Sequence, residues 1–140
     1  MNFNSLQFRQ LQKHEIPLVT QFYKQVYKKG AANKNDHVFI LKTQQILCAA
    51  RLKEVQGHLL LTGVACAEKY RGQGLASLLI TNLLKLQQQD IYCFPYPHLQ
   101  TFYQQLGFEL CPAELLPEQL ALQYQCYHSH QTLLCMVYSH

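Results

Sequence analysis

The sequence has no run of about 20 consecutive apolar residues, the length that an α-helix needs to cross a bilayer. Its first residues, Met1 to Ser5, also lack the basic and then apolar layout of a signal peptide. The formal net charge is only +4, and the lysines and arginines are spread over several segments instead of forming a dense basic stripe. These absences predict a cytoplasmic protein that binds neither a membrane nor nucleic acid.

The length and the cysteines limit the architecture further. A chain of 140 residues with 49% hydrophobic content can build one compact domain, which we place at residues 1–140. Nothing else suggests secretion, so we expect reduced and mostly buried thiols at all six cysteines: Cys48, Cys66, Cys93, Cys111, Cys126 and Cys135. Cys126, His128, His130 and Cys135 carry atoms that bind zinc, but their spacing matches no zinc finger or ribbon, and we predict no metal site.

Apolar periodicity divides the chain into short strands and amphipathic helices. Apolar residues from Ile16 to Val26 recur at intervals of three and four, which predicts a helix that tolerates Pro17 in its first turn. The full prediction is strands at 5–11, 38–41, 46–52, 58–66, 91–94, 108–110 and 132–138, and helices at 14–26, 74–86, 98–106 and 117–124. This order indicates an α/β fold of the α+β type, with a mixed central sheet and helices on its faces.

The most informative segment lies between the strand that ends at Cys66 and the helix that follows it. Arg71 to Ser77 reads R-G-Q-G-L-A-S. The first backbone N–H groups of a helix have no intrahelical partners, and the helix dipole adds partial positive charge there, so an anion is bound favourably. Gly72 and Gly74 allow a pyrophosphate to approach the main-chain nitrogens, and Arg71 adds a permanent cation.

Dinucleotide-binding folds and P-loops use the same device, but neither pattern is complete here. Ser77 occupies the last glycine position of G-x-G-x-x-G, and no Lys-Ser or Lys-Thr pair follows the loop. The segment instead resembles the acyl-CoA-binding motif Q/R-x-x-G-x-G/A of the GNAT superfamily of N-acetyltransferases, here at Arg71, Gly74 and Ala76. Downstream, Thr101 to Phe108 is similar to the F-Y-x-x-x-G-F segment of that family.

This resemblance implies the GNAT fold, with about six to seven strands, about four flanking helices and central strands that splay apart. It implies acetyl-CoA as the cosubstrate. The pantetheine arm would meet main-chain groups of Val64, Ala65 and Cys66. The pyrophosphate would lie on the glycine-rich turn and the start of the helix, at Arg71, Gly72, Gln73, Gly74, Leu75, Ala76 and Ser77.

The resemblance also implies a role for Tyr103 as the general acid. An acceptor amine attacks the acetyl thioester directly, the tetrahedral oxyanion collapses, and Tyr103 protonates the departing CoA thiolate. A phenol has a pKa of about 10, so it is a proton donor at neutral pH. The N–H of Cys66 is a candidate to polarise the acetyl carbonyl. The alternative is that Tyr103 is a core aromatic residue packed at helical spacing against Leu99.

Two positions depart from the family pattern. The family often has Asn before the helix that carries the tyrosine, whereas Tyr96 occupies that position here. Members that use a carboxylate base commonly carry Glu on the fourth strand, where this chain has the apolar stretch Leu59 to Leu61. The base stays open among Glu54, His58, His37 acting through a water, and an amine that arrives deprotonated.

Two functions of different classes follow. The first is an N-acetyltransferase whose acceptor is an amine of a small molecule, a peptide or a protein, entering between residues 30–37 and residues 111–131. The second is a non-catalytic acetyl-CoA-binding regulatory module that acts on a protein partner, in which Tyr103 only packs. The helix near Pro117 to Tyr127 carries an apolar face that would serve a homodimer or cover the acceptor site.

Overall fold

A computed structural model describes residues 5–26 and 35–140 of the chain. The described residues contain these strands and α-helices, in chain order: β1 Gln7–Gln10, α1 Ile16–Val26, β2 His37–Lys42, β3 Ile46–Val55, β4 His58–Cys66, α2 Leu75–Lys85, β5 Ile91–Cys93, α3 Gln100–Gln105, β6 Glu109–Leu110, α4 Glu118–His128 and β7 Met136–Tyr138. No helix in these ranges combines the length and the apolar character that crossing a bilayer demands. Residues 30–34 of the predicted acceptor segment and residues 1–4 lie outside the described residues.

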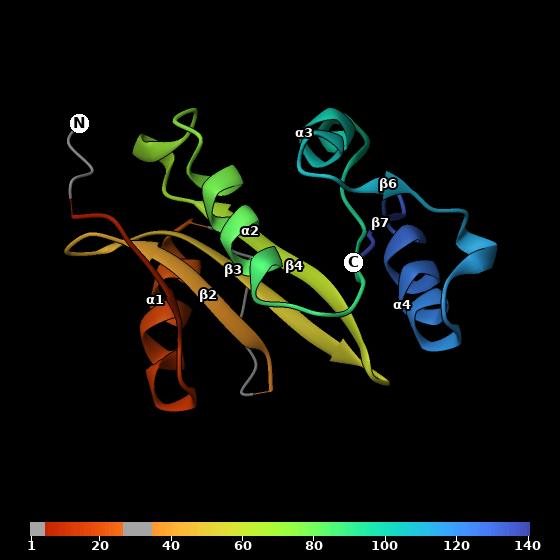
Figure 1. Ribbon diagram of the computed structural model, residues 1–140, viewed down its shortest axis with the longest axis horizontal. Coiled ribbons are helices and arrows are strands. Elements are labelled where there is room, and N and C mark those ends of the chain that lie inside the picture. Colours follow the sequence, from red (N-terminus) through yellow and green to blue (C-terminus); the bar gives the residue numbers. More distant parts are fainter. Residues whose placement is uncertain (1–4, 27–34) are drawn as a thin grey trace. The chain divides into compact units, whose positions relative to one another are not determined.

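The strands form one mixed sheet of seven, in the order β1-β2-β3-β4-β5-β7-β6 (Figure 1). The predicted α/β fold, a mixed sheet with helices, is confirmed. The chain divides into two compact units, the first made of residues 1–53 and 62–86 and the second of residues 54–61 and 87–140. β4 belongs to both units, because its first residues fall in the second unit and its last residues in the first.

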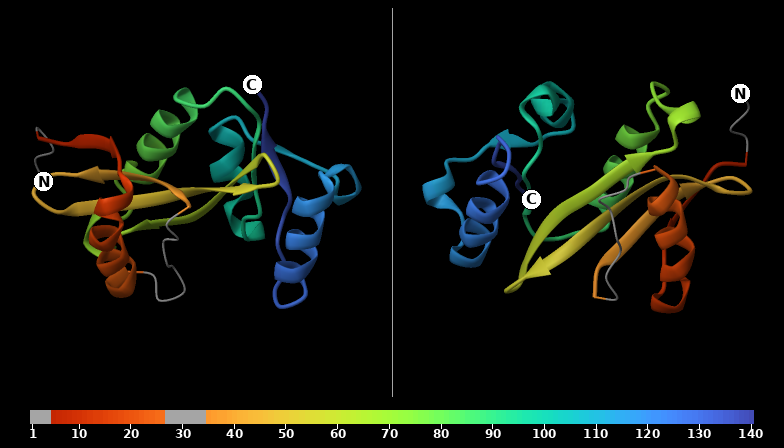
Figure 2. Two further views of the ribbon diagram at one scale, coloured as in Figure 1. Left: turned by 90° about the horizontal axis from the view of Figure 1, so that it is seen from below. Right: turned by 180° about the vertical axis from the view of Figure 1, so that it is seen from behind.

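In the first unit, β1 pairs antiparallel with β2 and β2 with β3, with Phe8 opposite Leu41. α1 and α2 lie on opposite faces of these strands, as the views from the front and from behind show (Figure 2). Successive side chains alternate between the two faces. Val38 and Ile40 belong to the core that α1 covers, whereas Phe39 stacks on Phe8 with 6.0 Å between the ring centroids.

α1 forms where the apolar period predicts it. Ile16, Val19, Phe22 and Tyr23 recur at helical spacing, and all four are buried. Pro17 is the second residue of the helix, where its missing N–H leaves no intrahelical hydrogen bond unmade. One stripe of the helix therefore supplies the core of the first unit, and this core includes residues of β2, β3 and β4.

In the second unit, the first residues of β4 run parallel to β5, and β7 pairs antiparallel with β5 and β6. The pairing of β4 with β5 covers Leu59 to Leu61, although β4 continues to Cys66. α4 places Leu120, which is fully buried, in a core with Leu60 and Cys135. The last five residues of β4 thus extend beyond the ladder with β5, at the place where the resemblance implies splayed strands.

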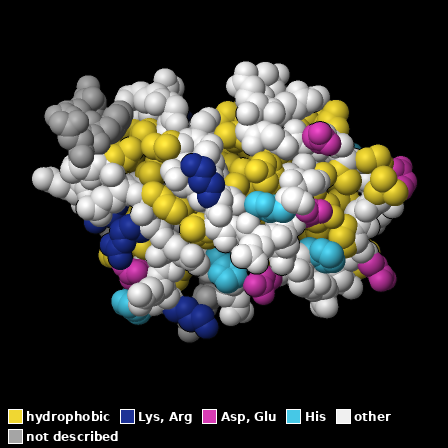
Figure 3. Space-filling view, viewed as in Figure 1, with side chains coloured by type: hydrophobic (Ala, Val, Ile, Leu, Met, Phe, Trp, Pro, Cys, Tyr) yellow, Lys and Arg dark blue, Asp and Glu magenta, His cyan; other side chains and the backbone are white. Residues whose placement is uncertain are grey.

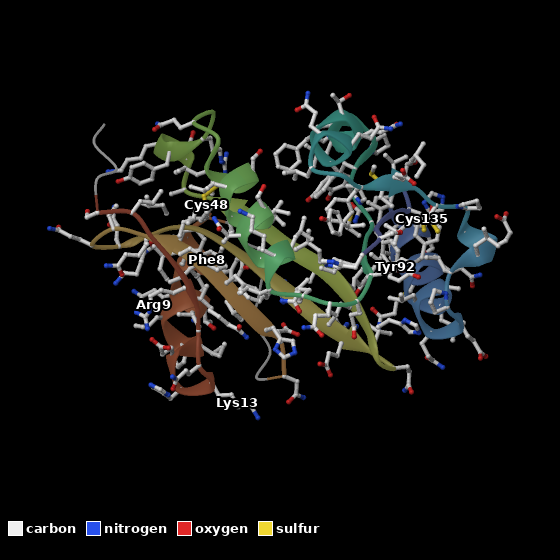
Figure 4. The ribbon with its side chains drawn as sticks, in the orientation of Figure 1. Phe8, Arg9, Lys13, Cys48, Tyr92 and Cys135 are labelled. Carbon is white, nitrogen blue, oxygen red and sulfur yellow. A yellow bond between two sulfur atoms is a disulfide. The ribbon has the colours of Figure 1, made fainter. Side chains whose placement is uncertain are left out.

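One expectation from the sequence is wrong. Cys48 on β3 and Cys66 at the end of β4 form a disulfide, whose sulfur–sulfur bond lies beside the label of Cys48 in Figure 4. The other four cysteines are free, as predicted, but only Cys93 and Cys135 are buried. The pairing arises because the two residues face each other across neighbouring antiparallel strands, and a sequence spacing of 18 does not reveal that register.

The last strand is also shorter than predicted, since it begins at Met136 instead of Thr132. The main chain of Leu133, just before this strand, makes its hydrogen bonds with side chains of α4. The hydroxyl of Tyr124 donates to the carbonyl of Leu133 at 2.8 Å, and the N–H of Leu133 donates to Nδ1 of His128 at 3.1 Å. Side chains of α4 therefore take the hydrogen bonds that a neighbouring strand would otherwise make.

Candidate functional site

The glycine-rich turn before α2 has the backbone that only glycine adopts readily. Gly72 and Gly74 have φ angles of +78° and +79°, in the left-handed region. A Cβ built on either residue would have no atom within 4 Å. Glycine is therefore required at these positions by the backbone conformation and not by packing. Because no atom of the described residues lies close by, the surface of the turn is open to a ligand.

Among the described residues, the start of α2 leaves its first backbone N–H groups without a side-chain cap. Gly74 is the residue that precedes the helix, and its carbonyl accepts the first helical hydrogen bond, from the N–H of Leu78 at 3.1 Å. The N–H groups of Leu75, Ala76 and Ser77 precede that bond, and no side chain of the described residues caps the helix start. Leu75 is buried and anchors the turn, so the backbone donors and the positive end of the helix dipole are held in place.

Arg71 stands beside this turn and connects it to the end of β4. Its Nε donates to the carbonyl of Cys66 at 3.1 Å, while the residue as a whole stays exposed. The short 3₁₀ turn between them, Glu68–Tyr70, buries Tyr70. The Nε of Arg71 is thus bonded to the end of the strand, while the rest of its exposed guanidinium group lies next to the glycine turn in the sequence.

The end of β4 presents alternate main-chain groups to its two edges. The N–H of Ala67 donates to the carbonyl of Leu47 on β3 at 2.9 Å. By alternation, Ala65 faces β3 as well, whereas Val64 and Cys66 face the opposite edge, beyond the stretch that pairs with β5. Ala65 instead adds its side chain to the core under α1. Of the three strand residues predicted to meet the pantetheine arm, Val64 and Cys66 therefore direct their main-chain groups away from β3, and the carbonyl of Cys66 already accepts from Arg71.

Tyr103 lies on α3, in the second unit, and is only 6% exposed. Its ring packs edge-on against Phe102 and Phe108, with centroid distances of 5.0 Å and 5.5 Å. Its carbonyl accepts hydrogen bonds from the N–H groups of Leu106 and Phe108, and Gly107, with φ of +104°, makes the turn that permits them. The F-Y-x-x-x-G-F segment is therefore a helix and its closing turn, which together fix the position of the tyrosine ring.

The two departures from the family pattern have structural counterparts. Tyr96, where the family often has Asn, directs its hydroxyl to Oε1 of Gln131 at 3.0 Å and stacks its ring on His98. His58, a candidate base, begins β4 at the opposite end from Cys66 and packs edge-on against Tyr92 at 6.3 Å. Neither observation identifies a base.

The residues considered for zinc do not gather. In residues 5–26 and 35–140, no group of three or more His, Cys, Asp or Glu side chains is placed to hold a metal ion. Cys135 is buried in the core of the second unit, and Cys126 is exposed on α4. His128 accepts the hydrogen bond from Leu133 and stacks on Tyr124 at 5.1 Å. Each of these side chains therefore has a separate structural environment.

Gly63, in the interior of β4, is a further feature of this region that the sequence did not single out. Gly63 has φ of +63°, and its carbonyl accepts a hydrogen bond from the hydroxyl of Tyr23. An isolated glycine in an otherwise apolar strand is a signal for a bulge or a close approach, so the sequence does contain a hint. Its partners come from other elements, and no local pattern indicates them.

Comparison with known proteins agrees with this geometry. A family model described as acetyltransferase (GNAT) domain matches residues 34–110, more than half of the chain. No curated protein matches the chain.

Solved structures show the same fold. The chain resembles ribosomal-protein-S18-alanine N-acetyltransferase from Escherichia coli with a TM-score of 0.67 and 14% identity, covering 96% of this chain and 93% of that one. For an acyl-CoA N-acyltransferase from Pseudomonas aeruginosa the TM-score is 0.69 and the identity 19%, with 96% and 100% covered. For N-acetylglutamate synthase from Neisseria gonorrhoeae, complexed with coenzyme A and N-acetyl-glutamate, the values are 0.72 and 14%. That match covers 96% of this chain and only 35% of the synthase.

Proposed function

Because the chain belongs to the GNAT family of acetyltransferases, we propose that it transfers the acetyl group of acetyl-CoA to an amine. The observation that carries this proposal is the open glycine turn at the start of α2, with Arg71 anchored beside it. The turn offers main-chain N–H groups, the positive end of a helix and a fixed cation, which together suit a pyrophosphate. Three solved structures of the same fold, two of them of the same synthase, are complexes with CoA, which supports this choice of cosubstrate.

The proposed cofactor residues follow the chain from strand to helix. Val64, Ala65 and Cys66 line the pantetheine arm, with the hydrogen bonds made by the main chain of Val64 and Cys66. The pyrophosphate lies on the glycine turn and the first turn of α2, in contact with Arg71, Gly72, Gln73, Gly74, Leu75, Ala76 and Ser77. The fixed N–H groups need no reorganisation when the phosphates arrive.

The proposed reaction is direct transfer. The nitrogen lone pair of the acceptor attacks the thioester carbon, the C–N bond forms, and the C–S bond breaks as the tetrahedral oxyanion collapses. Tyr103 gives its phenolic proton to the departing sulfur, and the amine loses one proton to solvent or to a base. Developing negative charge on the carbonyl oxygen is best stabilised by a fixed main-chain donor, and the N–H of Cys66 is our candidate.

The acceptor is an amine of a small molecule, a peptide or a protein. Proteins of this fold are named for small-molecule and for protein acceptors. One is an N-acetylglutamate synthase, and another is named for an alanine of ribosomal protein S18. At identities of 14%, neither name transfers to this chain. We also propose that residues 1–140 act as one acetyltransferase domain in the cytoplasm.

The test is a panel of amines incubated with acetyl-CoA, with acetylated products detected by mass spectrometry. We expect at least one product, and we expect Tyr103→Phe to lower its rate by about 10²-fold or more while CoA affinity is retained. Tyr92→Phe is the control, because Tyr92 is a second tyrosine of the same unit, is half-buried where Tyr103 is buried, and has no role in the proposal. If Tyr103→Phe turns over normally, Tyr103 is a packing residue. A silent panel together with tight CoA binding would instead favour a regulatory module.

The exposed apolar side chains of the surface bear on the oligomeric state. Large apolar side chains are exposed in both units, and yellow patches are visible on the face drawn in Figure 3. On α4, Leu122 and Tyr127 are 53% and 39% exposed. We propose a homodimer through this helix, and sedimentation that gives a monomer at high concentration would contradict it.

A further inference from the structure

β4 runs without a gap from His58 to Cys66, but its extended backbone conformation is broken at Gly63, just before the residues that we assign to the cofactor. The φ angle of +63° is outside the range of an extended strand, and a residue with a side chain adopts it at a cost. Space is also lacking, because a Cβ on Gly63 would meet Nε of Arg51 at 2.5 Å and Nη2 at 2.7 Å. The guanidinium group of Arg51 therefore occupies the place that a side chain at position 63 would take.

The carbonyl of Gly63 is also held by a side chain, which comes from α1. The hydroxyl of Tyr23 on α1 donates to it at 2.6 Å, and Tyr23 is fully buried. The guanidinium carbon of Arg51 lies 5.3 Å from the centroid of the Tyr23 ring, within the range of a cation–π contact. Three elements, α1, β3 and β4, therefore meet at this one peptide.

The charge of Arg51 is matched inside the cluster. Nη1 of Arg51 lies 3.1 Å from Oδ2 of Asp36, and the two side chains are only 13% and 5% exposed. A buried ion pair is weak evidence for stability, but it fixes geometry, because separating the partners would leave a charge in a poorly solvated place. Since the guanidinium group is already paired, an anionic ligand is not the best explanation for Arg51.

We propose that Tyr23, Arg51 and Asp36 are positioning residues, which hold the break at Gly63 and thereby aim the main chain that follows it. Main-chain groups alternate along a strand, so a bulge or a slip of one residue exchanges the groups that face each edge. With the backbone held in this conformation at Gly63, the main-chain groups of Val64 and Cys66 face away from β3. If the conformation at Gly63 changed, these groups would turn toward β3 and those of Ala65 would turn away from it. This inference rests on the proposed function, in which Val64 and Cys66 bind the pantetheine arm of acetyl-CoA.

Tyr23→Phe is the sharpest test, because it removes only the hydroxyl and leaves the ring against Arg51. We expect CoA to bind about 3- to 10-fold more weakly, as for the loss of one buried hydrogen bond, when affinity is measured by titration calorimetry. Tyr124→Phe is the matched control, since its hydroxyl also donates to a main-chain carbonyl, that of Leu133, at 2.8 Å. The control should lose similar thermal stability and bind CoA as the original protein does.

A second measurement separates this inference from the proposed function. In ¹⁵N–¹H spectra of the protein without CoA, Tyr23→Phe should shift the amide signals of Val64, Ala65 and Cys66, and Tyr124→Phe should leave them unchanged. If those signals stay in place, or if both variants weaken CoA binding equally, the positioning role is wrong. If the unmodified protein binds no CoA while the signals do shift, the network holds the strand as inferred and the proposed function fails.

Discussion

At the scale of single residues, the glycines with positive φ angles differ in what surrounds them. Gly57 in the turn between β3 and β4 has φ of +83° and no atom within 4 Å of a built Cβ. Gly107 has φ of +104°, but its Cβ would meet Cε2 of Tyr138 at 2.9 Å. Gly57 is thus required only for its backbone conformation. Gly107 is required for its backbone conformation and also because the Tyr138 ring on β7 leaves no room for a side chain.

We therefore predict that Gly107→Ala destabilises the protein more than Gly57→Ala. Backbone strain should cost about 1 kcal/mol at either site, and the clash with the Tyr138 ring should bring the loss at Gly107 to about 2–3 kcal/mol. Urea unfolding followed by circular dichroism measures both values. Equal losses in the two variants would mean that the Tyr138 ring moves aside freely.

The cysteines allow a prediction on redox state and reactivity. Under denaturing conditions without a reductant, maleimide should label Cys93, Cys111, Cys126 and Cys135 but neither Cys48 nor Cys66, because the latter two form the disulfide. Mass spectrometry of the labelled peptides identifies the sites. Labels on Cys48 and Cys66 in that sample would show that the pair is reduced in the protein as purified.

In the folded protein, we predict that Cys126 reacts with maleimide first. It is exposed on α4, whereas burial raises the pKa of Cys135 to about 12 and raises the pKa of Cys93 as well. The thiolate is the reactive form, so at pH 7 to 8 Cys93 and Cys135 remain protonated thiols and should react slowest. A time course of labelling tests this order, and early modification of Cys135 would contradict it.

At the scale of elements, the junction of β4 and α2 joins a strand end, a glycine turn and a helix start. In the proposed function the three parts contribute differently to CoA binding. The strand offers alternate main-chain groups, the turn leaves room for the phosphates to approach, and the helix supplies aligned N–H donors. Arg71 connects the first part to the second through the carbonyl of Cys66. A substitution that only fills the space beside the turn should therefore weaken CoA binding without much loss of stability.

Gly72→Ala makes that change. Its Cβ would meet no protein atom within 4 Å, so it would project into the open space where we propose that the pyrophosphate binds. We predict about 10-fold weaker CoA binding or more, with a loss of stability of about 1 kcal/mol from backbone strain. Gly57→Ala is the control, because it has a similar φ and equally open surroundings but lies away from the turn. Calorimetric affinities that fall equally in both variants would argue against the assigned pyrophosphate site.

At the scale of the whole molecule, the proposed function draws on both compact units. The glycine turn before α2 belongs to the first and Tyr103 to the second. We predict that CoA at about 100 times its dissociation constant raises the free energy of unfolding by about 2.7 kcal/mol. Hydrogen exchange should slow in peptides of both units, near residues 64–77 and near Tyr103. Protection confined to the first unit would separate Tyr103 from the cofactor and remove it from the mechanism.

Most of the secondary structure was predictable because it depends on local periodicity. β4 has the predicted bounds, His58 to Cys66, and α1 and α2 lie where apolar residues recur at helical spacing. The last strand was predicted too long, because the hydrogen bonds that Leu133 makes to Tyr124 and His128 come from α4. A strand length depends on such partners, which local sequence does not contain.

The sequence by itself determined the glycine turn, Arg71 beside it and the segment around Tyr103, because each depends on residue types at short spacing. The tertiary structure alone decided which side chains meet across strands. The disulfide of Cys48 and Cys66 depends on the register of β3 and β4. The contact of Tyr23 with Gly63 depends on how α1 lies on the sheet, because 40 residues separate the partners. Local chemistry is encoded in short patterns, whereas register and packing result from the cooperation of distant segments.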